Sequence, residues 1–394
     1  MKSSHRNVAV LCGCNGLLHI NNSVLMAVTA LAGATLAQNK ALATLPLTMY
    51  FVGAAISTIP MSFLMKQAGR RSGFVVGATC AVLGALVCAS ALHSQSFSIL
   101  CAGVFLLGIY FAAGQYYRFA AADISSPDFR SRAISLVLAG GVIGGFIGPE
   151  TSKLTIDRMG GNTYVGPYFS LAIYALIAIV VLRWVRIPLL SQQERQQEGR
   201  PLAVIARQPS FVVAVLCAMI CYGVMALLMT ATPLAMIACQ HPFSDAAFVI
   251  QWHMVGMFAP SFVTGYLIHR FGLLPIMLIG VLLNLICVGI AVAGIDLMNF
   301  WLALLCLGVG WNFLFVGATT LLTEVHTPAE RAKVQGFNDA AIFATLVASS
   351  LASGMLFTYQ GWQAMNYYAI PLLVVAGAAI VWLSLLRRSA RHAT

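Results

Sequence analysis

Charged residues are scarce in this 394-residue chain, where Asp, Glu, Lys and Arg together make up only 8% of the positions. A soluble domain carries about 25%. Hydrophobic residues account for 60%, and the mean hydropathy is +0.88. Too few charges remain to cover the surface of a soluble protein of this length. The composition therefore excludes that class and predicts an integral membrane protein.

Motifs of several catalytic classes are also missing. The sequence holds no Gly-Lys-Ser/Thr loop of the kind that cradles the phosphates of ATP. Its apolar runs contain no His-x3-His pair and no obvious pairing of a nucleophile with a base. The 10 cysteines fall almost entirely inside those runs, where they are interpreted as small apolar filler. We therefore expect no enzyme activity, no cofactor and no metal site.

Apolar runs long enough to cross a bilayer recur along the whole chain. They lie at 8–31, 43–64, 73–92, 98–121, 133–148, 168–185, 211–237, 247–268, 273–294, 300–322, 334–357 and 367–386. Continuous apolar runs lack the in-and-out alternation of a membrane β-barrel. The predicted fold is therefore all-α, with twelve transmembrane helices.

The two halves of the chain repeat one another. Segment 123–132 recurs as 324–333, with an acid, a proline, an arginine and a second cation at the same spacing. Parallel duplication of a hydrophobic unit is found in some secondary transporters. We expect an N-terminal six-helix bundle at 1–185, a polar linker at 186–207 and a C-terminal six-helix bundle at 208–394.

Lys and Arg are distributed unevenly between the two sides of the expected bundles. Eighteen of the 22 fall on the side of the N-terminus, while Lys40, Lys153 and Arg158 fall on the other side and Arg118 lies within a helix. Cytoplasmic loops carry such an excess. We therefore expect a multi-pass protein of the cytoplasmic (inner) membrane with both termini in the cytoplasm. This placement explains the net charge of +11 without a nucleic-acid partner.

Two loops resemble a family signature. Segment 62–71 reads Ser-Phe-Leu-Met-Lys-Gln-Ala-Gly-Arg-Arg, and segment 265–272 reads Gly-Tyr-Leu-Ile-His-Arg-Phe-Gly. Both resemble the Gly-x-Leu-x-Asp-Arg-x-Gly-Arg-Arg/Lys loop of the major facilitator superfamily, and the repeated acid–proline–arginine element resembles that superfamily too. The resemblance covers essentially the whole chain. It implies two pseudo-symmetric six-helix bundles around a central cavity, with transport by alternating access.

One position departs from the signature in both loops. Lys66 and His269 stand where the family has an Asp that helps to lock the cytoplasmic side. We expect a pair between Lys66 and Asp339 to replace that lock. The expected gate residues lie in these loops, in the repeated element and at the start of helix eleven: Lys66, Arg70, Arg71, Asp123, Arg130, Arg132, Glu324, Arg331, Lys333 and Asp339.

Polar side chains within the membrane are costly and mark transport pathways. Asn15, His19 and Asn22 share one face of the first helix, because they follow the spacing i, i+4, i+7. Two interpretations of Arg118 stay open: it binds an anionic group of the substrate, or it snorkels to the inner interface or pairs with a gate acid. By the resemblance, the cavity is lined mainly by helices one, four, seven and ten. The expected substrate-binding residues are Asn15, His19, Asn22, Gln115, Arg118, Tyr222, Gln251, His253, Trp311 and Asn312.

None of the 11 acidic residues lies in the middle of an expected helix. His19 and His253 are the titratable side chains expected deep in the membrane, and imidazole has a reference pKa of about 6.5. We therefore expect any coupling to protons to run through these two residues. Without a fixed negative charge, the cavity favours a neutral or anionic organic solute over a polycation.

The leading expectation is a secondary active transporter of a small organic solute, working as a monomer in the bilayer. Two alternatives stay open. A drug or metabolite efflux antiporter is suggested by segment 140–149, whose Gly-rich sequence ending in Gly148-Pro149 partly resembles an element of the family's drug:proton antiporters. A transport-inactive membrane sensor is the other. The sequence does not indicate the solute.

Overall fold

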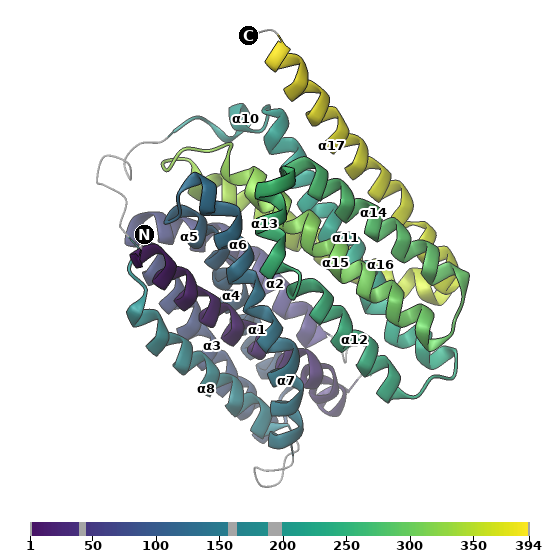
Figure 1. Cartoon of the computed structure of the whole chain (residues 1–394). Helices are drawn as coiled ribbons and strands as arrows, with labels where there is room; N and C mark the ends of the chain where they lie inside the picture. The colour runs from purple at the N-terminus through teal and green to yellow at the C-terminus, as the bar shows by residue number, and fades with distance from the viewer. Residues whose placement is uncertain (1, 39–44, 157–163, 188–198, 393–394) are drawn as a thin grey trace. The chain divides into compact units, whose positions relative to one another are not determined.

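The computed structural model describes residues 2–38, 45–156, 164–187 and 199–392, which form helices joined by short turns (Figure 1). No strand occurs among these residues. Ten helical segments in the described part are long and apolar enough to cross a membrane. The fold is therefore all-α with many membrane-spanning helices, as the apolar runs predict.

The helices form two compact units. Unit 1 comprises Met1–Ser125, Leu136–Glu198 and Pro328–Phe343, and unit 2 comprises Ser126–Ser135, Gly199–Thr327 and Ala344–Thr394. Each unit thus includes a short segment that belongs, by sequence, to the other half of the chain. The expected linker at 186–207 lies partly outside the described residues.

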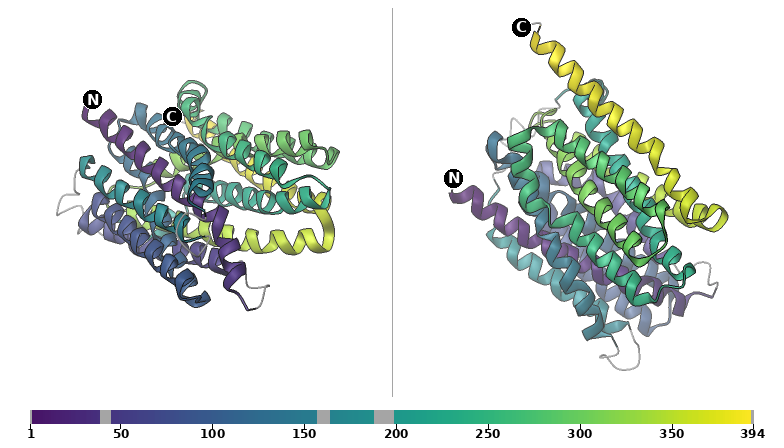
Figure 2. Two further views of the ribbon diagram at one scale, coloured as in Figure 1. Left: turned by 90° about the horizontal axis from the view of Figure 1, so that it is seen from below. Right: turned by 45° about the vertical axis from the view of Figure 1, so that its right-hand side comes forward.

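Unit 1 contains the helices of the first repeat. Its core is built around α4, which packs against α2 and α3, and around α1, which packs against α7 and α8 (Figures 1 and 2). The helices are α1 (Lys2–Leu36), α2 (Leu45–Ala68), α3 (Arg70–His93), α4 (Phe97–Gln115), α5 (Tyr117–Asp123), α7 (Gly141–Thr155), α8 (Val165–Val181) and the start of α16 (Arg331–Tyr367).

Unit 2 repeats this packing. Helix α15 packs against α11, α12 and α14, and α17 packs against α11 and α14 (Figure 2). The helices are α10 (Leu202–Ile205), α11 (Pro209–Ala238), α12 (Phe243–Phe258), α13 (Ser261–Phe271), α14 (Leu273–Ala293), α15 (Leu297–Thr323), the rest of α16 and α17 (Ala369–His392). Helix α6 (Arg130–Ala139) has residues in both units.

The duplication is visible in the backbone as well as in the sequence. Gly69 ends α2 with φ 89° and ψ 158°, and its counterpart Gly272 ends α13 with φ 93° and ψ 159°. This region of positive φ is open to glycine at little cost. At the α2–α4 contact a Cβ on Gly108 would meet the carbonyl of Tyr50, and at the α12–α15 contact a Cβ on Gly308 would meet the carbonyl of His253.

Three of the expected spans are divided into two helices. Span 98–121 is divided at Tyr116, span 133–148 at Gly140, and span 247–268 between α12 and α13. The last break has a direct cause, because Pro260 supplies no backbone N–H to the helical ladder. Each helix flanking Pro260 is therefore shorter than a full span, and neither is among the ten spanning segments.

Large apolar side chains face outward along single helix stripes. In unit 1, Ile173, Leu176 and Val180 of α8 are exposed, and in unit 2 the exposed residues Ile279, Leu282 and Ile286 occupy the same spacing on α14. The spacing i, i+3, i+7 places each set on one helix face. Such stripes suit a lipid environment, since apolar patches of this kind are rarely left in water.

Candidate functional site

The polar stripe of α1 is buried within unit 1. Asn15 and His19 are buried and Asn22 is half-buried. The Nδ2 amide of Asn15 has no hydrogen-bond partner among the described residues. His19 lies at the contact of α1 with α7, where a Cβ on Gly144 would meet the His19 backbone. The glycine-rich stretch of α7 thus lets two backbones approach closely.

Tyr50 joins this stripe, although sequence reasoning did not select it. Its hydroxyl donates a hydrogen bond to Asn22 Oδ1 at 3.0 Å. Its ring stacks on Phe111, with centroids 5.3 Å apart and planes at 26°, and Phe111 meets Phe343 edge-on at 5.5 Å. Tyr50 is the repeat counterpart of His253, and this signal could have found it. A small pocket here is lined by Leu18, Asn21, Leu25, Tyr50, Leu107 and Tyr110.

Unit 2 contains an aromatic cluster formed by Tyr222 of α11, Phe258 of α12 and Trp311 and Phe315 of α15. Trp311 stacks on Phe315 with centroids 4.7 Å apart and planes at 28°. Tyr222 meets both rings edge-on, at 5.3 and 5.1 Å. The indole Nε1 of Trp311 is buried without a hydrogen-bond partner among the described residues. Tyr222 and Trp311, two expected binding residues, are therefore neighbours.

The side chain of Asn312 forms hydrogen bonds on both sides of the break between α12 and α13. Asn312 Nδ2 donates to the Met257 carbonyl at 2.6 Å and to Ser261 Oγ at 2.5 Å, while its Oδ1 accepts from Thr264 Oγ1 at 2.6 Å. These bonds tie α15 to both sides of the break at Pro260, and they use both amide hydrogens. A part for Asn312 in substrate binding stays a prediction.

His253 is completely buried on α12. Its Nδ1 lies 2.8 Å from the carbonyl oxygen of Leu304. A carbonyl only accepts, so the proton sits on Nδ1. The neighbouring Gln251 is half-buried.

Arg118 and Asp339 form a buried ion pair within unit 1. Arg118 Nη2 and Asp339 Oδ1 are 2.5 Å apart, and the two side chains are 2% and 1% exposed. Gln115 Oε1 accepts a second bond from Arg118 at 2.5 Å, and Asn338 Nδ2 donates to Asp339 Oδ1 at 2.8 Å. Of the two interpretations of Arg118, the structure has it paired with the gate acid. Asp339 thus has a different partner from the expected Lys66.

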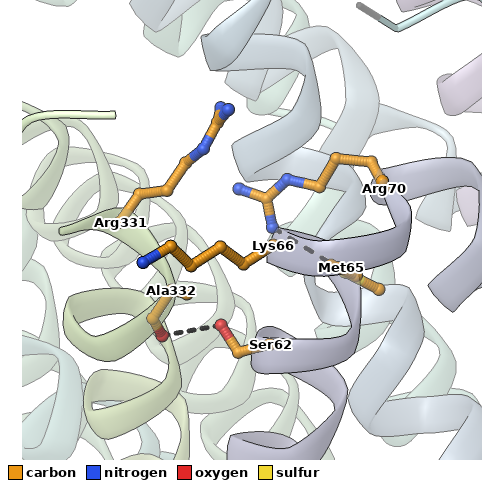
Figure 3. A pocket seen from close by; sticks show the side chains of 7 residues that line it. Ser62, Met65, Lys66, Arg70, Arg331 and Ala332 are labelled. Atoms are coloured by element: carbon orange, nitrogen blue, oxygen red, sulfur yellow. Dashed lines mark hydrogen bonds between the residues drawn. The ribbon is translucent and has the colours of Figure 1, made fainter. Parts of the chain in front are cut away.

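A second charged group lies at the loop between α2 and α3. Asp123 Oδ2 accepts from Arg70 Nε and Nη2 at 3.1 and 2.9 Å, and it pairs with Arg331 Nη1 at 2.6 Å. Arg70 Nη2 also donates to Gln335 Oε1 at 2.5 Å. Lys66 lines the same pocket beside Arg70 and Arg331 (Figure 3). We call Lys66, Arg70, Asp123 and Arg331 the charged cluster.

The corresponding loop in unit 2 contacts its neighbouring helix through uncharged groups. Gly265 N–H donates to Ser135 Oγ at 3.0 Å, and Ser131 Oγ donates to the Gly265 carbonyl at 3.2 Å. Arg132 lies over the ring of Tyr266 at 5.3 Å. Glu324, the counterpart of Asp123, pairs with Arg387 at 2.9 Å in an exposed position.

The expected gate residues therefore divide between the two units. The structure brings together Lys66, Arg70, Asp123 and Arg331 in unit 1, with the buried Asp339 paired separately. Arg71 is exposed, and Lys333 and Arg130 are half-buried.

The family model of the Major Facilitator Superfamily matches residues 11–250 and 214–394 of the chain. Among curated proteins, the riboflavin transporter RfnT of Brucella anthropi is 37% identical over 375 residues, covering 95% of this chain and 94% of the relative. The uncharacterized MFS-type transporter YddS of Bacillus subtilis is 26% identical over 372 residues, covering 89% and 85%.

Solved structures share the fold. The human organic anion transporter MFSD10 aligns with a TM-score of 0.77 at 16% identity, covering 96% of this chain and 99% of that one. The transporter FucP in the outward conformation aligns with a TM-score of 0.75 at 15% identity and the same coverage. The predicted twelve-helix, two-bundle membrane fold is thereby confirmed. The chain belongs to the Major Facilitator Superfamily.

Proposed function

We propose that this transporter carries riboflavin, or a closely related uncharged flavin, across the cytoplasmic membrane into the cell. The observation that carries the proposal is the 37% identity, over 95% of the chain, to a riboflavin transporter. Identity at this level runs through both repeats rather than one loop. The sequence-based expectation of a small neutral or anionic organic solute is narrowed to a neutral one.

The charges inside unit 1 support an uncharged solute. Arg118 is the cation that sequence reasoning offered to an anionic substrate, and it is compensated by Asp339 at 2.5 Å. Recruiting Arg118 for a substrate anion would leave Asp339 buried without its counter-charge. Breaking a buried pair in this way costs about 3–5 kcal/mol. The interactions of an anionic substrate would have to offset this cost before the binding free energy became favourable.

The aromatic and amide groups support a flat solute with hydrogen-bonding edges. Trp311 with Phe315 in unit 2, and Tyr50 with Phe111 in unit 1, present stacked rings. Aromatic stacking adds about 0.5–1.5 kcal/mol beyond the burial of area. Asn15 has an amide without a partner among the described residues, and it suits the carbonyl edge of a flavin ring.

In the proposed cycle, the bundles 1–185 and 208–394 rock about a central substrate site. The charged cluster and the Ser131/Ser135–Gly265 contacts then act as two parts of a gate on the cytoplasmic side. Proton coupling, where present, is assigned to His19 or His253. The chain works as a monomer with both termini in the cytoplasm, and it performs transport without chemical conversion of the solute.

Uptake of labelled riboflavin into proteoliposomes tests this proposal. We expect saturable entry that excess unlabelled riboflavin suppresses, and no comparable suppression by riboflavin 5′-phosphate added outside. A pH gradient, imposed in one set of vesicles, separates coupled from uncoupled transport. Efflux is distinguished by riboflavin leaving loaded cells faster when the transporter is expressed. Folded protein that moves riboflavin no faster than empty vesicles would refute the assignment and revive the sensor alternative.

A further inference from the structure

The small pocket beside Tyr50 lies within unit 1, among α1, α2 and α4. We call it the Asn21 pocket. Its volume is about 10 Å³. A site needs at least about 10–15 Å³ to hold one water molecule. The pocket is therefore about the size of one water and too small for an organic solute. The residues that line it are Leu18, Asn21, Leu25, Tyr50, Leu107 and Tyr110.

Two side chains of the Asn21 pocket carry polar atoms that are buried without a partner. Asn21 and Tyr110 are 5% and 2% exposed. The Nδ2 amide of Asn21 donates to the carbonyl of Leu17 at 3.3 Å, whereas its Oδ1 has no hydrogen-bond partner among the described residues. The hydroxyl of Tyr110 has none there either. Buried polar groups are nearly always hydrogen-bonded, so two exceptions at one pocket indicate a partner from outside the chain.

The neighbouring tyrosines do not supply that partner. The Tyr50 hydroxyl donates its hydrogen to Asn22 Oδ1 at 3.0 Å, so its oxygen can only accept a further bond. The hydroxyl of Tyr117 on α5 lies near that of Tyr110, but the two do not meet in hydrogen-bonding geometry. Asn21 Oδ1 is an acceptor and still requires a donor.

We propose that the Asn21 pocket binds one ordered water, which donates to Asn21 Oδ1 and accepts from the Tyr110 hydroxyl. The second hydrogen of the water would be donated to the Tyr50 oxygen. The water would then make three hydrogen bonds, and a buried water typically makes about three. A metal cation fits less well, because none of the lining residues carries a negative charge to offset it within the membrane.

This water would connect two helices behind Tyr50. Asn21 lies on α1 and Tyr110 on α4, so a bridge between them ties α1 to α4. The same water would fill the space against the side chain of Tyr50, whose ring stacks on Phe111 and whose hydroxyl bonds Asn22. Asn21 and Tyr110 would thus act as positioning residues for Tyr50.

The second repeat lacks the acceptor that the water requires. The segment Val8–Cys12 recurs as Val213–Cys217, and the same offset of 205 residues makes Ala226 the counterpart of Asn21. Ala226 is buried, and its methyl group accepts no hydrogen bond. We therefore expect the bound water in unit 1 and no equivalent water at Ala226.

Radiolytic footprinting measures this water directly, whatever solute is transported. An X-ray pulse turns water into hydroxyl radicals, which oxidise the side chains beside a bound water even where these are buried. The full-length chain in phosphatidylcholine nanodiscs is mixed with water labelled with heavy oxygen, and the delay before the pulse is varied. Mass spectrometry reads the oxygen added to each tyrosine. Tyr116 is the internal control, because it is fully buried and its hydroxyl donates directly to the Thr58 carbonyl at 2.9 Å.

We expect Tyr110 to be oxidised well above Tyr116, and heavy oxygen to appear at Tyr110 later than at the exposed Tyr359. In Asn21→Leu, the oxidation of Tyr110 should fall to the level of Tyr116. Equal oxidation of Tyr110 and Tyr116 in the wild type overturns the proposal. So does oxidation that persists in Asn21→Leu, or heavy oxygen that reaches Tyr110 as fast as Tyr359. Replacing sodium by choline should change nothing, and a change would mean a cation in place of the water.

The variant Tyr110→Phe gives an independent test through the sign of its effect. Removing a hydroxyl that bonds a water should lower the melting temperature, whereas removing a buried hydroxyl that bonds nothing is neutral or stabilising. A melting temperature equal to or above that of the wild type would overturn the proposal. The wild-type footprint decides the question even where a variant fails to fold.

Discussion

The loops that join α2 to α3 and α13 to α14 are repeat counterparts with the same backbone and different chemistry. Gly69 and Gly272 adopt nearly identical dihedral angles. In unit 1, an ionic network around Asp123 fastens the start of α16. In unit 2, the neutral contacts of Gly265 with Ser131 and Ser135 fasten the start of α6.

Serine and glycine occupy opposite sides of the contact in the two units. In unit 1, Ser62 on α2 donates to the carbonyl of Ala332 at 2.6 Å and lies beside Gly336. In unit 2, the glycine is Gly265 on the loop side and the serine is Ser135 on the partner helix. The contact in unit 1 includes one serine and one glycine, and the contact in unit 2 includes one glycine and two serines. The duplication has therefore preserved close packing, while the ionic network around Asp123 is found at the loop of unit 1.

The largest loss of stability and transport is expected at the Arg118–Asp339 pair, where the two copies differ most in charge. With the repeat offset of 201 residues, its counterparts are Thr319 and Leu138, which carry no charge. Arg118→Ala should destabilise the protein by about 3–5 kcal/mol and abolish transport, because Asp339 would stay buried alone. Thr319→Ala, the matched control, should cost about 1 kcal/mol. Thermal unfolding in detergent and riboflavin uptake check both. Equal losses in the two variants would contradict the account.

Removing the acid from each loop network should give the next largest difference. Asp123→Asn leaves Arg70, which is 6% exposed, short of its counter-charge, and it should cost about 2–3 kcal/mol of stability. Glu324→Gln breaks an exposed pair with Arg387, whose contribution is about 0–1 kcal/mol after screening. Denaturation midpoints at low and high salt measure both. A larger loss in Glu324→Gln would reverse the comparison.

Adding one methyl group tests the close contacts. A Cβ on Gly265 would lie 2.5 Å from Arg132 Cα and 2.8 Å from the Ser131 carbonyl, so backbone would have to move. On Gly336 the nearest atoms are Cβ and Oγ of Ser62, at 3.2 and 3.5 Å. Gly265→Ala should cost about 1–2 kcal/mol and Gly336→Ala less than about 1 kcal/mol. Similar melting temperatures for the two would show that unit 2 tolerates looser packing than proposed.

Replacing each buried imidazole should change coupling more than stability. His19→Gln is expected to keep riboflavin binding while removing acceleration by a pH gradient, because glutamine does not titrate in this range. His253→Gln is the comparison, since its Nδ1 already bonds the Leu304 carbonyl. Uptake with and without the gradient separates the two. Gradient-driven uptake that persists in both variants would remove histidine from the coupling mechanism.

Much of the fold could be predicted because local sequence patterns determine where its helices and turns lie. Apolar runs mark the helices, and the paired glycines mark the turns after α2 and α13. Internal breaks were less visible. Pro260 could have predicted the division of span 247–268, whereas no proline stands at the breaks at Tyr116 and Gly140.

The candidate site was harder to predict, because the residues that contact one another there are distant in the sequence. Arg118 and Asp339 are 221 residues apart, and nothing near either residue identifies the other. Asn312 looked available as a polar residue of the tenth span, yet its amide is used to bridge the broken ends of α12 and α13. Local spacing predicts which face of a helix a residue occupies. It does not show whether the donors and acceptors of a polar side chain are already used by hydrogen bonds within the protein or are free for a ligand.

Riboflavin counterflow tests the account most directly, since it requires one site that opens to both sides in turn. Proteoliposomes loaded with unlabelled riboflavin are diluted into a trace of labelled riboflavin, using wild type, Asp123→Asn and Glu324→Gln. We predict a transient accumulation of label in wild type and in Glu324→Gln, and a much slower one in Asp123→Asn. Absence of accumulation in folded wild-type protein would contradict transport of riboflavin by alternating access.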